Sequence, residues 1–324
     1  MMTATIETTH GVSAEQWSNQ VFGEYLGSNP FFNFMGSDSN SIIQVKEELT
    51  KSPGDAITVQ LRARLTGAGV TGDTVLKGNE EDLVFYNQKL EVDTIRHAVI
   101  LRGEMSEKRT AFDLRNQARE ALVDWAADKL KNDIVTALTD TSVGRVQSRY
   151  LYGATDSNWD ATHATALANV DSSNDKLTTS VISRAKRKAM LDGTRRVRPF
   201  NLKLGNRVEE IYVLFAHPYA VRDLLTDNDF KDVNIHIPTN FSDSVLVHGQ
   251  RYKGMWDGVM IFECEEMPVL ASAGHSSADV GHNVLCGAQS LAVAWGKRTN
   301  YKEDVDDYGH ENGFAIDEIR GAEK

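Results

Sequence analysis

An alternating run of side chains near residue 60 constrains the fold of this chain more than any other feature. Apolar residues occupy every second position from 57 to 65, namely Ile57, Val59, Leu61, Ala63 and Leu65. The residues between them are polar. Because successive side chains of a strand point to opposite faces, this period of two predicts a strand with one apolar face.

A second extended run follows a glycine-rich, polar segment. It spans residues 83–101, and its alternation changes phase just after Val92. One extra residue in a strand, a bulge, would produce such a phase change. The two runs together predict a long hairpin with a wide loop over residues 53–103. Since a two-stranded hairpin is marginally stable by itself, we expect its apolar face to lie on another surface.

The glycines of the loop, Gly67, Gly69 and Gly72, match the G-x-G-x-x-G pattern of dinucleotide-binding proteins. In those proteins a helix begins at the glycines and its N-terminus meets the pyrophosphate. Here the next residues, DTVLKGNEED, show no apolar helical stripe. A nucleotide-binding enzyme is therefore the weaker hypothesis, and a loop tip without a cofactor is the prediction.

A long helix is predicted over residues 110–138, beginning at a capping-box-like Thr110-Ala111-Phe112-Asp113. Its apolar residues recur every fourth position, as Leu114, Ala118, Leu122, Ala126, Leu130, Ile134 and Leu138. Ala121, Trp125 and Val135 widen this stripe. A four-residue spacing drifts by ~40° per step on a 3.6-residue helix, so the apolar band winds around it. We expect a helix ~43 Å long that is contacted on several sides.

The remaining predicted elements are a mixture of helices and strands. Helices are predicted over residues 177–192 and from Pro218 to Leu225. Residues 140–175 and 226–254 are expected to be mostly irregular, with short strands near residues 244–248. Strands are predicted at 211–215, 255–264 and 283–295, and 301–305 is expected to pair with 313–319 across a polar turn. The order indicates an α+β fold.

Composition and charge exclude several classes of protein. The formal net charge of −11 argues against a dedicated nucleic-acid binder, which would show a basic footprint. No run approaches the ~18–20 apolar residues of a membrane span, and the N-terminus lacks a secretory signal pattern. Cys264 and Cys286 are too few for a disulfide framework and are expected to be partly buried thiols in a protein of cytosolic origin.

No motif predicts catalysis or a metal. Glu303, Asp304, Asp306 and Asp307 do not keep the ligand spacing of a calcium loop, so a solvated turn is expected there. His217, before Pro218, is expected to cap or pack. The glutamates at 263, 265 and 266 carry no sequence sign of a raised pKa, as a general acid would need. We therefore predict no catalytic, cofactor-binding or metal-binding residues.

Two surfaces are candidates for contact with a partner. An aromatic cluster, Phe31, Phe32 and Phe34, either covers the core of its own chain or docks on a neighbouring subunit. A basic cluster is either a solvated helix face or a patch for nucleic acid or an acidic subunit face. It comprises Arg184, Lys186, Arg187, Lys188, Arg195, Arg196 and Arg198. The residues predicted to serve assembly are Phe31, Phe32, Phe34, Ile57, Val59, Leu61, Gly67, Gly69, Gly72 and Trp125.

Several longer stretches resemble one protein family. They are GDTVLKGNEEDLVFYNQKLEVDTIRHAV, RTAFDLRNQAREALVDWAADKL, FAHPYAVRDL, CGAQSLAVAWG and DDYGHENGFAIDEIRG. In this order they resemble the major capsid proteins of tailed phages, which share the Hong Kong 97-type fold. The similarity is greatest to the family of N-four-type short-tailed phages, and it covers residues from about 55 to about 320.

The resemblance implies a division of the chain. Residues 1–52 would be an N-terminal arm and 53–103 the extended loop, or E-loop, that reaches across a neighbouring subunit. Residues 104–140 would hold the spine helix of the peripheral domain, 141–282 the axial domain, and 283–324 strands that return to the peripheral domain.

The resemblance also implies a function. The chain would be a non-enzymatic major capsid protein that assembles into hexamers and pentamers of an icosahedral shell around double-stranded DNA. Its partners would be copies of itself, scaffolding protein, the portal, a decoration protein and the packaged DNA, with no membrane. It would be made in the host cytoplasm and reside in the virion. The alternative within this fold is an encapsulin-like shell of a cellular nanocompartment.

Overall fold

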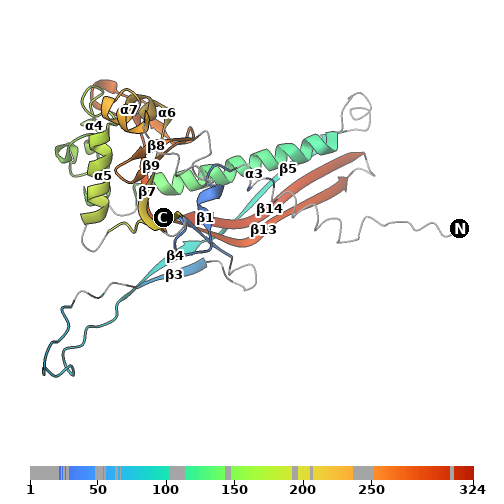
Figure 1. Cartoon of the computed structure of the whole chain (residues 1–324). Coiled ribbons are helices and arrows are strands. Elements are labelled where there is room, and N and C mark those ends of the chain that lie inside the picture. The colour runs from blue at the N-terminus through green and yellow to red at the C-terminus, as the bar shows by residue number, and fades with distance from the viewer. Residues whose placement is uncertain are drawn as a thin grey trace.

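The computed structural model describes residues 22, 24, 26, 29–47, 54, 56–62, 65, 67–102, 114–142, 147–191, 196–204, 207–235, 251–306 and 310–324. A long helix lies along a sheet, a second sheet with short helices packs at one end of it, and a hairpin projects away from both (Figure 1). The predicted α+β class is confirmed.

The first sheet has five strands in the order β1-β2-β13-β14-β5. Their bounds are β1 Met35–Gly36, β2 Ile43–Lys46, β5 Asp93–Arg102, β13 Leu291–Asp306 and β14 Glu311–Glu323. β14 runs antiparallel to both β13 and β5, whereas β2 runs parallel to β13. The predicted closing strand pair is confirmed and is longer than expected. Glu303, Asp304 and Asp306 belong to strand β13, so the predicted solvated turn is wrong at these positions, although their side chains are exposed, and Asp307 lies outside the described residues.

The helix on this sheet is α3, Leu114–Thr139. Its 26 residues correspond to a length of ~39 Å. It packs against β5, β13 and β14. Its buried residues follow the predicted winding band, namely Ala118, Leu122, Val123, Ala126, Leu130, Ile134, Val135 and Leu138. Ala121 is exposed, so it does not widen the band, and the predicted capping box lies outside the described residues.

The second sheet also has five strands, in the order β12-β7-β9-β8 with β6 on β7. Their bounds are β6 Phe200–Leu204, β7 Arg207–Ala216, β8 Tyr252–Trp256, β9 Val259–Glu263 and β12 Val284–Cys286. The single strand predicted over 255–264 is wrong because the chain reverses between β8 and β9. Asp257 and Gly258 make this turn with φ of 47° and 72°, the pair of positive values that a tight hairpin turn needs.

Short helices surround the second sheet. The α-helices are α4 His163–Ala168, α5 Thr179–Leu191, α6 Pro218–Leu224 and α7 Asn228–Ile235. The 3-10 helices are η1 Phe32–Phe34, η3 Gln147–Arg149, η4 Asp156–Asn158 and η7 His275–Ser277, and β10 Val269–Leu270 pairs with β11 Val280–Gly281. The predicted α5 and α6 are confirmed, whereas α7 occupies part of a segment expected to be irregular. His217 caps α6, since its Nδ1 accepts a hydrogen bond from the Tyr219 amide at 3.2 Å.

The main core lies where α3 and the two sheets meet. Phe31 and Phe34 are buried there, each with its ring edge-to-face against Phe215 at 5.2 and 5.1 Å between centroids. The aromatic cluster therefore covers its own chain's core, and only Phe32 keeps a largely exposed ring. Cys264 and Cys286 are free thiols, as predicted, but they are fully buried where partial burial was expected, and burial raises the pKa of each to about 12.

Two buried carboxylates connect α3 to the sheets. Glu318 on β14 accepts from Arg320 Nε at 2.6 Å and from Thr299 Oγ1 at 2.9 Å, and Arg320 Nη2 lies 2.9 Å from Asp133 Oδ2 on α3. Beside the second sheet, Glu266 pairs with Arg251 at 3.0 Å. Burial would raise the pKa of Glu266, but the hydrogen bonds from Arg251 and the Cys264 thiol outweigh it and hold that pKa below its usual 4.5. A lowered pKa is the opposite of what a general acid needs.

Candidate functional site

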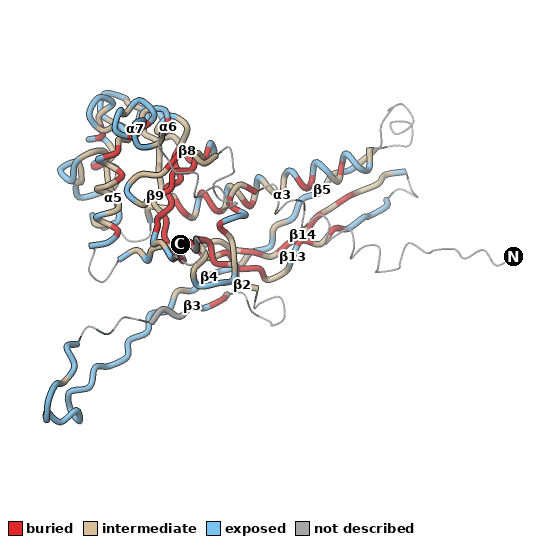
Figure 2. The backbone as a smooth tube through the Cα atoms, in the orientation of Figure 1, coloured by how far each residue is buried: buried red, intermediate tan, exposed pale blue. Residues whose placement is uncertain are grey.

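The projecting hairpin is made by β3, Ala56–Arg62, and β4, Phe85–Glu91, which pair antiparallel from Ala56 opposite Glu91 to Arg62 opposite Phe85. Beyond the paired strands, the chain continues outward as a long open loop, residues 67–84 (Figure 1). Every residue of this loop except Val70 is exposed, as Figure 2 shows along its whole length.

The hairpin is shorter than the sequence predicted. Its second strand ends at Glu91, and after Val92 the chain enters the first sheet as β5, where it pairs with β14. The predicted bulge is therefore wrong. The phase of the alternation changes at Val92 because β4 and β5 belong to different sheets and bury opposite faces.

The base of the hairpin is fixed to the body by packing and by one long-range hydrogen bond. Ile57 and Leu90 are buried in a small apolar cluster with Ala294 of β13. Gln88 Nε2 donates to the backbone carbonyl of Lys324. At Gly321 a Cβ would lie 1.8 Å from the Glu91 carbonyl oxygen, so only glycine allows β14 and the hairpin to approach this closely. A pocket of about 70 Å³ under the hairpin is far below the ~300 Å³ of ordinary small-molecule sites, and we assign it no ligand.

The loop has a defined internal geometry. Gly69, Gly72 and Gly78 have φ of 68°, 67° and 92°, a region that other residues rarely adopt. Glu81 Oε2 accepts a hydrogen bond from the Gly67 amide at 2.7 Å, which brings the two sides of the loop together. No helix follows Gly67–Gly72, so the predicted loop tip is confirmed.

Large apolar side chains line the outer part of the hairpin and its loop. They are more than two-fifths exposed and comprise Leu65, Val75, Leu76, Leu83, Val84, Phe85 and Tyr86. Apolar side chains that gather on an exposed surface mark an interaction site more often than isolated ones do. Val75 and Leu76 were not among the residues predicted to serve assembly, although they follow Gly72 by three and four positions.

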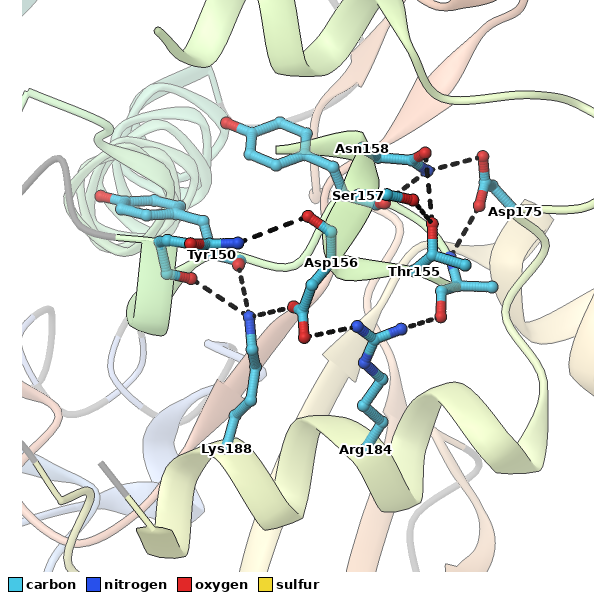
Figure 3. Close-up of polar contacts among 11 residues, drawn as sticks. Tyr150, Thr155, Asp156, Ser157, Asn158, Asp175, Arg184 and Lys188 are labelled. Carbon is cyan, nitrogen blue, oxygen red and sulfur yellow. Dashed lines mark hydrogen bonds and ion pairs between the residues drawn. The ribbon is translucent and has the colours of Figure 1, made fainter. Parts of the chain in front are cut away.

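Three members of the basic cluster form ion pairs with carboxylates of the same chain. Arg184 and Lys188, one turn apart on α5, both contact the Asp156 carboxylate, at 2.6 and 2.5 Å (Figure 3). These hydrogen bonds, that of Lys188 first, hold the pKa of Asp156 below its usual 3.8. Lys186 pairs with Asp257 of the β8–β9 turn at 2.9 Å. Of the two predicted alternatives, a solvated helix face and a patch for a partner, neither describes these three residues, because each is paired within the chain.

Asp175 supports the segment that carries Asp156. Its carboxylate accepts from the Ala154 amide at 2.7 Å and from Asn158 Nδ2 at 2.9 Å (Figure 3). Arg187, Arg196 and Arg198 stay exposed, and Arg195 lies outside the described residues.

The residues predicted to serve assembly divide into three groups. Phe31, Phe34 and Ile57 are buried within the chain, which corrects their assignment to contact with a neighbour. Val59 and Trp125 are half-buried, and the Trp125 ring lies 4.5 Å from that of His97. Phe32 and the three glycines are exposed, and the side chain of Leu61 lies outside the description.

Comparisons with known proteins agree with this architecture. The chain is 26% identical to the major capsid protein of Pseudomonas phage KPP25, over 94% of this chain and 87% of that protein. The capsid of Ralstonia phage GP4 matches with a TM-score of 0.77 and 25% identity, over 90% of this chain and 85% of that one. The capsid of Cyanophage Pam1 matches with a TM-score of 0.78 and 27% identity, over 99% and 94%.

The expected Hong Kong 97-type fold is confirmed by these capsid structures. The family model described as phage capsid protein matches residues 5–324, so it also includes most of the N-terminal segment for which the sequence analysis found no resemblance. With this match over nearly its whole length, the chain belongs to the phage capsid protein family.

Proposed function

We propose that this phage capsid protein assembles into hexamers and pentamers of an icosahedral shell around double-stranded DNA. The observation that supports this most is the loop at residues 67–84, which extends from the body with apolar side chains exposed. A monomeric protein would gain nothing from such a loop, whereas in a closed shell each copy offers a neighbour the surface to cover it. Many weak contacts of this kind then act together.

The described elements suggest how the subunit is divided. We assign α3 and the first sheet to a peripheral domain, and the second sheet with α4–α7 to an axial domain that gathers around the centre of each hexamer or pentamer. The extended loop is the hairpin and its tip, ending at residue 91 instead of 103. The described residues of the proposed N-terminal arm, 22, 24, 26 and 29–47, lie on the chain's own body, so residues 1–21 are the candidate for reaching a neighbour.

The partners and location follow from the same proposal. We expect scaffolding protein and the portal during assembly, a decoration protein on the shell, and a final place in the virion after synthesis in the host cytoplasm. The role is structural and non-enzymatic. The negative net charge and the internal use of Lys186 and Lys188 favour weak, non-specific contact with packaged DNA.

Deletion of residues 66–80 tests the proposal. The two ends of the deleted segment are close, since the Gly67 amide and the Glu81 carboxylate are hydrogen-bonded, so the hairpin can close without strain on the body. We expect a folded subunit by circular dichroism and no closed shells by negative-stain microscopy. A matched control, Thr71→Ser with Thr74→Ser, keeps the loop and should assemble as the wild type does. Normal shells from the deletion variant would contradict the proposal.

A further inference from the structure

We propose that the carboxylate of Glu323 makes the attachment of the hairpin to the body depend on pH, so that the hairpin is held more tightly in weak acid than at neutral pH. The proposal concerns contacts within one subunit. It goes beyond the proposed function and holds whether or not shells form.

The end of β14 runs beside the second strand of the hairpin. Two contacts join them, because the Glu91 carbonyl lies close to Gly321 and Gln88 Nε2 donates to the carbonyl of Lys324. Glu323 stands between these two contacts along β14, and it is half-buried. Its side chain lines the pocket of about 70 Å³ under the hairpin. Since this pocket is large enough for water, the carboxylate can exchange a proton with the solvent.

Negative charge comes to this point from three elements. Glu323 lies on β14 and Glu91 on β4, while Asp140 follows α3 and is brought close because Lys324 Nζ donates to its carbonyl. Among the described residues, no hydrogen bond or ion pair of the Glu323 carboxylate is recorded, and no group of acidic residues could hold a metal ion there. The Glu323 carboxylate therefore faces like charges without a partner that offsets them.

The basic groups near this point are engaged elsewhere. Lys89 pairs with Glu91 at 2.8 Å in an exposed contact, and the Lys324 ammonium is held by the carbonyl named above. His282 and Arg149 act on Lys324, and burial first, then the charge of Lys324, lowers the pKa of His282. In the part of the chain that the structure describes, none of these groups forms an ion pair with the carboxylate under the hairpin.

The sign of the pH dependence follows from these surroundings. Burial, with repulsion from Glu91 and Asp140, raises the pKa of Glu323 above its usual 4.5. Asp140 stays charged in weak acid, because hydrogen bonds from Ser142 hold its pKa below the usual 3.8. When the hairpin leaves the body, Glu323 loses this cover and its pKa returns toward 4.5. A proton on Glu323 therefore stabilises the attached hairpin, fully below about pH 4.5 and less as the pH rises through the raised pKa.

Hydrogen exchange of the β3 and β4 amides in unassembled full-length subunits, at pH 7 and at pH 5, tests the proposal. Protection factors are corrected for the intrinsic exchange rate and compared with those of β7 and β9 in the second sheet. In the wild type we expect the protection of the hairpin to rise severalfold at pH 5 relative to the second sheet. Glu323→Gln removes the charge, so it should show the higher protection already at pH 7 and no further rise at pH 5.

Two further variants separate the cause. Glu303→Gln is the matched control, since it removes an exposed carboxylate at the far end of β13 and should respond to pH as the wild type does. Glu91→Gln leaves Glu323 in place and removes part of the repulsion, so its response should be smaller than that of the wild type. The proposal is overturned if the wild type shows no rise, or if either Glu323→Gln or Glu91→Gln keeps the full response. Assembly is read separately by microscopy, so failure here leaves the proposed function untouched.

Discussion

Buried charge is concentrated at one position of the subunit. Arg320 and Glu318 are each about 2% exposed, and they lie under the stretch of β13 where the register with β14 shifts twice, between Trp295 and Asn300. Thr299, in this stretch, donates to Glu318, while Arg320 reaches Asp133 on α3. The ion pair thus fixes the register of two long strands and their position under the helix.

Arg320→Ala should be among the most destabilising single substitutions in the chain. It breaks the buried ion pair between Arg320 and Glu318, and breaking such a pair by removing one partner costs about 3–5 kcal/mol in the free energy of unfolding. Lys89→Ala removes an exposed pair with Glu91 and should cost about 1 kcal/mol or less. Urea denaturation of unassembled subunits measures both, and equal losses for the two variants would contradict this account.

At the level of elements, the hairpin is held by the strand that follows it and by strands from the end of the chain. β4 continues through Val92 into β5, so its direction is set by the first sheet. Leu90 of β4 packs on Ala294, and the backbone of Glu91 passes close to Gly321. The position of the loop therefore depends on β13 and β14 as much as on the hairpin itself.

Gly321→Ala should release the hairpin. The added methyl would meet the Glu91 carbonyl, and such overpacking costs about 1–3 kcal/mol, which corresponds to opening that is roughly 5- to 150-fold more frequent. Gly313→Ala is the matched control on the same strand, since its Cβ would lie 3.5 Å from the nearest atom. Hydrogen exchange of the β3 and β4 amides measures the difference. Unchanged exchange in Gly321→Ala would show that the close approach is not required.

The local sequence pattern was enough to predict the helices and strands whose apolar residues recur at a regular spacing. The alternation around residue 60, the four-residue stripe of α3 and the Pro218 helix start were all read correctly. The passage of the chain from the hairpin into the first sheet at Val92 was not predicted. It depends on pairing with β14, which lies more than two hundred positions later. The turn at Asp257-Gly258 did carry a local signal, an Asp-Gly pair between apolar runs, and was overlooked.

The candidate site was predicted only in part for the same reason. The hairpin and its glycine tip were identified by their pattern. The internal pairing of Arg184 and Lys188 was not predicted, because their partner Asp156 lies in an irregular segment whose sequence shows no periodic pattern. The burial of Phe31 and Phe34 depends on Phe215 and Phe262, which no local pattern connects to them.

For the whole molecule, contact with DNA depends more on where the charged side chains lie than on the net charge. The net charge is −11, yet Arg187 on α5 and Arg196 and Arg198 in the segment after it are exposed. Their neighbours on α5 are neutralised by carboxylates of the same chain. The subunit thereby keeps a small cationic area while it avoids a large one that would hold DNA.

Removing those carboxylates should convert the subunit into a DNA binder. Asp156→Asn with Asp257→Asn frees Arg184, Lys186 and Lys188, and the salt dependence of DNA binding should steepen by a slope on the order of 2–3. Asp160→Asn with Asp279→Asn gives the same net charge without breaking an ion pair recorded among the described residues. Fluorescence anisotropy with duplex DNA over a series of salt concentrations compares them. Identical binding by the two variants would contradict the account.

The hydrogen bond between Gln88 and the Lys324 carbonyl joins residues 236 positions apart, and β13 and β14 provide the surface on which the hairpin rests. During translation the hairpin leaves the ribosome long before that surface exists. We therefore expect the nascent chain to hold its loop in place only after the last strands have been made. A chain that still lacks β13 and β14 would therefore lack the contacts that hold the base of its hairpin.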